Sequence, residues 1–205
     1  SSDTLQSGDD VWVIGLKGDH QLVHQASTVS SVESITLPLS RTMRFRDTNL
    51  EVVTLVNAPS DIDGVLTNRK GEVVAKWASF AYQTGGESSQ FNGGISSELV
   101  EEFVEVVRSG KPVHSMEMEL GYTPLFAARK LGVDEDWLKK LEKHNPGKRR
   151  ALSITRLVTG APGSKLLKNG DMILAVDDEV VTTFRELERA VQKPQVTLTV
   201  WRDAE

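Results

Sequence analysis

The sequence predicts a mainly β first half followed by an α+β second half. Residues 11–80 contain short apolar or alternating segments separated by polar turns, a pattern typical of strands. The apolar spacing then changes to the helical period in "SELVEEFVEVVRSG". At 205 residues the chain is long enough for one large domain or for two small ones, each with its own core, and we favour two.

The first half contains five strand-like segments. In chain order they are "VWVIGLK", "QLVHQASTVSSVE", "LEVVTLV", "GVLTN" and "EVVAKWASF". The last two are joined by Asn68-Arg69-Lys70-Gly71, and a glycine that closes a short polar link suits a turn in which φ becomes positive. We therefore predict a hairpin over Gly64 to Ser79.

An amphipathic helix is predicted at the end of the first half. Ser96 or Ser97 can cap its start, and Gly110 can end it. Its apolar face comprises Leu99, Val100, Phe103, Val106 and Val107. Pro112 disfavours a helical conformation in Lys111, so we place a domain boundary there, with domains at 1–111 and 112–205.

The second half mixes strands and helices. The segments "VHSMEMELGY", "ALSITRLV", "MILAVDD" and "VTLTVWRD" are predicted strands, and "TTFRELERAVQK" is a predicted helix. Thr123 followed by Pro124 predicts another helix start, with Thr123 as the N-cap and Pro124 at the first helical position.

Composition excludes several classes of function. The chain has no cysteine, so thiolate metal sites, disulfides and cysteine nucleophiles are excluded. Its net charge of -5 argues against a nucleic-acid surface, and no apolar run approaches the ~20 residues of a membrane span. His20 and His24 have a metal-ligand spacing only on a helix, and they lie in a β region, so we predict no metal and no cofactor. The polar opening "SSDTLQSGDD" shows no secretory signal, and we expect an intracellular protein.

Two parts of the sequence resemble the HtrA/DegP-like serine protease family. The stretch from Thr159 to Asp203, with "GDMILAVDDEV" and "VTLTVWRD", resembles an HtrA-type PDZ domain. The segments "GDDVWVIGLKG", "HQASTVSSVE" and "GVLTNRKGEVVAKW" resemble the second β-barrel of a chymotrypsin-like protease domain. The resemblance implies a degenerate trypsin-like protease domain over 1–111, comprising this barrel and a closing helix, followed by a PDZ domain over 112–205.

The resemblance also locates the position of the expected nucleophile. The family has Gly-Asn-Ser-Gly-Gly just before the hairpin, whereas this chain, aligned on Gly64, has Ser60-Asp61-Ile62-Asp63-Gly64. Ile62 therefore stands where the serine is expected. Ser60 would serve only after a two-residue shift, which would displace the oxyanion amides as well.

The chemistry of acyl transfer argues against catalysis by this chain. The reaction needs a nucleophilic oxygen, a base about 3 Å from it and N–H donors aimed at the oxyanion. Ile62 offers no oxygen, and carboxylates at Asp61 and Asp63 would oppose the developing negative charge. The family's His and Asp come from the first barrel, which we do not recognise here. The four histidines, which we interpret as surface or structural residues, are His20, His24, His114 and His144.

A candidate peptide groove lies in the PDZ-like half. PDZ domains bind a chain terminus by strand addition, with the carboxylate held on backbone N–H groups. The segment that resembles the carboxylate loop is Glu119, Leu120, Gly121 and Tyr122, and the facing helix would present Phe184, Leu187, Glu188 and Val191. Glu119 would set a negative charge beside the ligand, and Pro124 lacks an N–H. A groove that is short, blocked or filled by the chain's own residues stays an alternative to a working one.

Taken together, the resemblance implies a non-catalytic scaffold or regulatory segment of an HtrA-type serine endopeptidase. Large fungal and plant relatives duplicate the protease and PDZ unit with a degenerate second copy, and the fungal member is a nuclear protein linked to apoptosis, so we expect a nuclear location. The alternative is a PDZ adaptor that binds C-terminal or exposed apolar peptides. Expected partners are other domains of the parent protein, a peptide, and a second copy through exposed apolar surface and strand edges.

Overall fold

The computed structural model describes residues 5–35, 49–84 and 87–203. The chain divides into two compact units, Ser1–Lys111 and Pro112–Glu205. No helix in the described stretches is long and apolar enough to cross a membrane.

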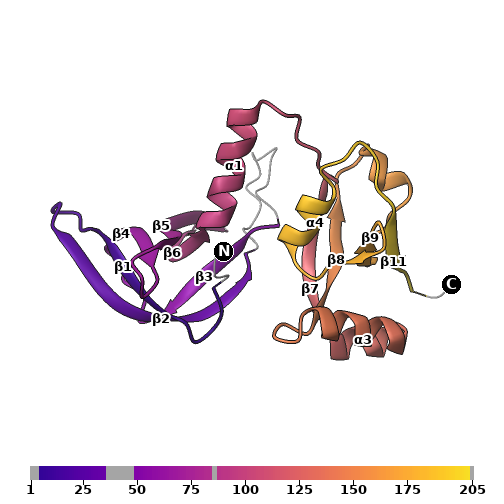
Figure 1. Ribbon diagram of the computed structural model, residues 1–205, viewed down its shortest axis with the longest axis horizontal. Coiled ribbons are helices and arrows are strands. Elements are labelled where there is room, and N and C mark those ends of the chain that lie inside the picture. The colour runs from indigo at the N-terminus through magenta and orange to yellow at the C-terminus, as the bar shows by residue number, and fades with distance from the viewer. Residues whose placement is uncertain (1–4, 36–48, 85–86, 204–205) are drawn as a thin grey trace. The chain divides into compact units, whose positions relative to one another are not determined.

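The first unit is a closed antiparallel barrel, as the fold class predicted (Figure 1). Its strand order is β1-β2-β3-β6-β5-β4, with β4 pairing back to β1. Each of these strands therefore has a neighbour on both sides, although β3 and β6 meet at the single pair of Val53 and Gly94. The barrel strands are β1 (Asp10–Leu16), β2 (Leu22–Ser34), β3 (Glu51–Val56), β4 (Asp63–Thr67), β5 (Val73–Thr84) and β6 (Glu87–Ser96).

The predicted hairpin is present as β4 and β5. The Asn68 N–H donates to the Glu72 carbonyl at 3.0 Å, and the Gly71 N–H donates to the Asn68 carbonyl at 3.0 Å. Gly71 has φ 78°, the left-handed conformation that the turn requires. Local turn chemistry therefore determines this connection.

Strand β6 was not predicted, because its polar, glycine-rich sequence shows no alternation. It forms through its pairing with β5, in which the rings of Phe80 and Phe91 stack with centroids 5.2 Å apart. Gly93 allows close packing against β3, since a Cβ at this position would lie 2.3 Å from Val52 Cγ1. The pairing with β5, rather than local propensity, accounts for this strand.

The core of the barrel is formed by apolar side chains of β1 to β5 and by Ile62. Trp77 and Leu66 are completely buried in it. The buried members of this core are Val11, Val13, Val29, Val53, Leu55, Ile62, Leu66, Ala75 and Trp77.

Helix α1 (Ser97–Ser109) follows β6 and ends at Gly110, which has φ 60°. These bounds agree with the sequence prediction. Only part of the predicted apolar face packs on the barrel, however. Leu99 is buried, whereas Phe103 and Val107 are 63% and 82% exposed. Figure 1 shows α1 projecting from the barrel, and this geometry keeps most of its apolar face away from the strands.

The second unit contains a five-stranded antiparallel sheet with order β10-β9-β8-β7 and β11 paired to β9, so β7 lies at an edge (Figure 1). Thr123 and Pro124 belong to β7, and Pro124 is the N-cap of α2, so the predicted Thr123 cap is wrong by one residue. The elements are β7 (Met118–Pro124), α2 (Leu125–Leu131), α3 (Glu135–His144), β8 (Arg150–Leu157), the 3-10 turn η1 (Pro162–Lys165), β9 (Met172–Val176), β10 (Glu179–Val180), α4 (Phe184–Ala190) and β11 (Leu198–Trp201).

Candidate functional site

Ile62, at the position expected for a nucleophile, lies just before β4 with its side chain inside the barrel. It is 3% exposed and belongs to the same core as Leu66 and Trp77. This side chain is a packing element, and it has no atom that could attack a carbonyl carbon.

Two glycines hold this segment against β1. Gly64 pairs with Gly15 in the antiparallel register of β4 and β1. A Cβ on Gly64 would lie 2.1 Å from the Ile14 carbonyl oxygen, and a Cβ on Gly15 would lie 2.2 Å from the Asp63 carbonyl oxygen and 2.8 Å from Ile62 Cγ2. Both positions therefore require glycine, and the close approach of the strands directs Ile62 into the core.

The polar residues around Ile62 face solvent. Ser60, Asp61 and Asp63 are exposed, and Asp61 forms an ion pair of 3.6 Å with Lys17, whose side chain is 42% exposed. A surface pair of this kind interacts weakly because water screens it. The only hydroxyl in the five-residue segment is that of Ser60, which lies on the outside of the barrel unit.

Among the described residues, no base is hydrogen-bonded to the Ser60 hydroxyl. In the part of the chain that the structure describes, no serine hydroxyl is hydrogen-bonded to a histidine ring. His20 lies between β1 and β2 with φ 66°, and His24 is an exposed residue of β2. His114 and His144 belong to the second unit, where His144 Nε2 lies 3.0 Å from Glu186. The same described residues contain no cluster of three acidic or histidine side chains that could hold a metal ion.

In the second unit, the candidate carboxylate loop forms part of edge strand β7. Glu119 lies 9% exposed, and its carboxylate is paired with Arg156 on β8. The Thr155 hydroxyl donates to the Glu119 carbonyl at 3.0 Å. Arg156 thus compensates the negative charge that we expected to oppose a ligand carboxylate.

The candidate groove residues of α4 and of its C-cap, Val191, contribute mainly to the core. Phe184, Leu187 and Val191 are 1–3% exposed and share one apolar cluster with Leu120, while Glu188 is half-buried. The structure therefore brings the predicted residues of β7 and α4 together as packed neighbours.

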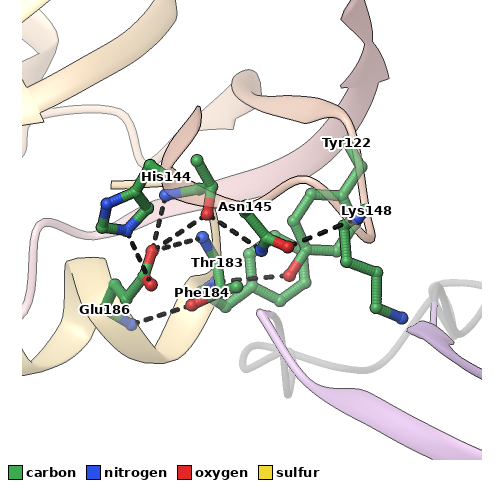
Figure 2. Close-up of polar contacts among 8 residues, drawn as sticks. Tyr122, His144, Asn145, Lys148, Thr183, Phe184 and Glu186 are labelled. Carbon is green, nitrogen blue, oxygen red and sulfur yellow. Dashed lines mark hydrogen bonds and ion pairs between the residues drawn. The ribbon is translucent and has the colours of Figure 1, made fainter. Parts of the chain in front are cut away.

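Tyr122 connects β7 directly to the start of α4. Its ring stacks on Phe184 with centroids 4.3 Å apart, and its hydroxyl oxygen accepts the Phe184 N–H at 3.2 Å (Figure 2). The Arg150 guanidinium lies 3.3 Å from the centre of the same ring. These contacts set the separation between strand and helix at this end.

A polar network that sequence reasoning missed anchors the same end of α4 (Figure 2). Thr183 and Glu186 form a capping box, and Glu186 also accepts the Thr182 N–H at 2.7 Å. Burial acts to raise the pKa of Glu186, but the Thr182 N–H and His144 outweigh it, so this pKa lies below its ordinary value. The spacing Thr-x-x-Glu was a signal that could have identified the cap.

The other end of α4 is attached to the segment before β7. The Gln192 side-chain amide donates to the His114 carbonyl at 2.8 Å and accepts the His114 N–H at 3.1 Å. Helix α4 is thus tied at both ends to the chain that forms and precedes the edge strand.

Comparison with known proteins shows similarity to proteases. No protein-family model matches the chain. It is 31% identical over 210 residues to Protease Do-like 7 of Arabidopsis thaliana, covering 92% of this chain and 19% of the relative. It is also 31% identical to pro-apoptotic serine protease NMA111 of Yarrowia lipolytica, covering 99% of this chain and 21% of the relative. The chain therefore spans about one fifth of the length of these relatives.

The fold is shared with solved HtrA-type proteases. The structure of the HtrA-type protease AlgW with a tripeptide matches all of this chain and 64% of its own, with a TM-score of 0.54 and 17% identity. This agreement supports a chymotrypsin-like barrel followed by a PDZ fold. From its relatives, the chain belongs to the HtrA-like serine protease family.

Proposed function

We propose that these 205 residues form a non-catalytic segment of an HtrA-type serine endopeptidase, in which the first unit is a protease barrel without a nucleophile and the second is a PDZ module. The observation that carries the proposal is the burial of Ile62 at the position aligned with the family's serine. A catalytic serine must present its oxygen to substrate and to a base. The side chain at this position points into the core instead.

The surroundings of Ile62 support a packing role. Gly15 and Gly64 allow β1 and β4 to approach closely. The backbone just before Gly64 therefore has little freedom to turn the side chain of residue 62 outward. The two neighbouring carboxylates, Asp61 and Asp63, add negative charge where an oxyanion would form. Residue 62 therefore contributes to the packing of the barrel and lacks the nucleophilic oxygen that acyl transfer needs.

Labelling with a fluorophosphonate probe for activated serines tests this proposal. The unmodified chain, an Ile62→Ser variant and a Ser60→Ala variant would be compared with an active HtrA protease as the positive control. We expect no labelling of any of the three. Labelling of the unmodified chain that disappears in Ser60→Ala would identify Ser60 as an activated nucleophile and refute the proposal.

We further propose that the longer protein is an endopeptidase whose activity does not depend on these residues. The names of the relatives support this reading. Ser60→Ala in the longer protein should leave peptide-bond hydrolysis unchanged. Loss of activity in this variant, with folding intact, would contradict it.

Peptide binding by the second unit is the second candidate function. It is favoured by the position of β7 at the sheet edge and by the attachment of α4 to Tyr122 and His114, which holds strand and helix at a defined separation. Titration with peptides carrying a free C-terminal carboxylate, and with the same peptides amidated, separates the alternatives. Saturation by the free carboxylates alone would support a PDZ adaptor, whereas no binding at high micromolar peptide would reject it.

A further inference from the structure

Helix α1 carries an apolar surface that the barrel does not cover. Four large apolar side chains on it, Val100, Phe103, Val104 and Val107, are 40%, 63%, 40% and 82% exposed. Their spacing of i, i+3, i+4 and i+7 places them on one side of the helix. We call these four residues the α1 stripe. Contiguous exposed apolar surface of this kind marks interaction sites.

The stripe is distinct from the face by which α1 packs on its own unit. Leu99 is the buried residue of the helix. At 100° per residue, Leu99 and the half-buried Val106 point to one side, and the centre of the stripe is rotated by about 100° from them. A partner can therefore contact the stripe without displacing α1 from the barrel.

Charged residues border the stripe on one side. Glu101 and Arg108 are exposed and lie seven residues apart, which is about 10 Å along the axis. Among the residues that the structure describes, no hydrogen bond or ion pair engages the side chain of either one. Both charges are thus available to a partner that approaches the stripe.

These charges are complementary to a second copy of the same helix in the antiparallel direction. With a two-fold axis between Phe103 and Val104, Val100 of one helix faces Val107 of the other. Glu101 is then level with Val106 of the other helix, and Arg108 lies about 3 Å from that level on the same flank, so the two charged side chains can meet. The contact occurs twice because the pair is symmetric. In a parallel pair, the same flank of the two helices would lie on opposite sides of the contact, so Glu101 and Arg108 would not meet. Flanking charges of this type set the direction in which helices associate.

We propose that the α1 stripe is the contact surface for a second copy of this chain, with the two α1 helices packed antiparallel. A helix of 13 residues is about 20 Å long. The interface is therefore smaller than that of a stable, obligate dimer, and the association is weak and reversible.

Sedimentation equilibrium of the 205-residue chain over a range of concentrations tests the contact surface. Val107→Glu introduces a charge into the stripe and should weaken dimerisation at least about tenfold. Leu22→Glu is the matched control, because Leu22 is 74% exposed on β2, away from α1. It should leave dimerisation unchanged. Circular dichroism checks that both variants are folded.

Charge exchange tests the antiparallel direction. Glu101→Arg or Arg108→Glu alone sets like charges opposite one another and should weaken the dimer about tenfold. The double variant restores two attractive pairs and should recover the original affinity.

Three results would overturn the proposal. The first is a monomer at all concentrations up to about 1 mM, because a dimer with a dissociation constant of about 1 mM is detected at that concentration. The second is equal dissociation by Val107→Glu and Leu22→Glu. The third is a double charge variant that associates no better than either single variant.

Discussion

Replacing Ile62 by serine should restore a hydroxyl to the sequence and cost the barrel a large part of its stability. The side chain is 3% exposed. The isoleucine side chain has four carbon atoms. Serine keeps the first of these, replaces one with oxygen and lacks the other two. At about 0.8 kcal/mol per buried carbon group, the lost burial alone costs about 2.5 kcal/mol. The remaining cavity and the buried hydroxyl add to this, and we expect a total loss of about 3–5 kcal/mol in the free energy of unfolding.

The loss in the free energy of unfolding is measured by urea unfolding, with hydrogen exchange and mass spectrometry as the readout. Peptides from β4 and β5 report on the first unit separately. Ile62→Val removes one carbon and should cost about 0.5–1.5 kcal/mol. Ser60→Ala alters an exposed residue and should change stability by less than about 0.5 kcal/mol. A loss below about 1 kcal/mol for Ile62→Ser would refute the reasoning, because a buried Ile cannot be truncated at so small a cost.

Three further predictions concern other parts of the chain. Gly64→Ala should destabilise the first unit strongly in thermal unfolding, since its Cβ would lie 2.1 Å from the Ile14 carbonyl oxygen, whereas an exposed Ser→Ala control should not. Thr183→Ala should cost about 1 kcal/mol in urea unfolding of the second unit, and Thr183→Ser should recover most of it, because the N-cap oxygen is the group removed. Asp171 accepts hydrogen bonds from Arg202, which hold the pKa of Asp171 below its ordinary value. Its contribution to stability is therefore present above about pH 3.9 and lost as the pH falls through the lower folded pKa. Asp171→Asn should abolish that part of the pH dependence, and an unchanged pH profile would contradict the assignment.

Local signals predicted those elements whose determinants lie within a few residues. The turn at Gly71, the end of α1 at Gly110 and the alternation of β1 and β2 each depend on neighbours in the chain. The strand β6 lacked such a signal, because its formation depends on a ladder with β5. The start of α2 was misplaced by one residue because Thr123 is recruited into β7 by its pairing with Ala151 on β8.

The sequence by itself determined that residue 62 has no nucleophilic oxygen, that cysteine chemistry is absent, and that the chain resembles an HtrA-like protease followed by a PDZ domain. Only the tertiary structure decided that Ile62 is buried, that the six strands form a closed barrel, and that the barrel leaves the α1 stripe exposed. The physical reason is that residue type and spacing are local properties, whereas burial depends on contacts between segments far apart in the chain. Gly15 and Gly64 illustrate this, because their close approach across two strands directs the side chain of Ile62.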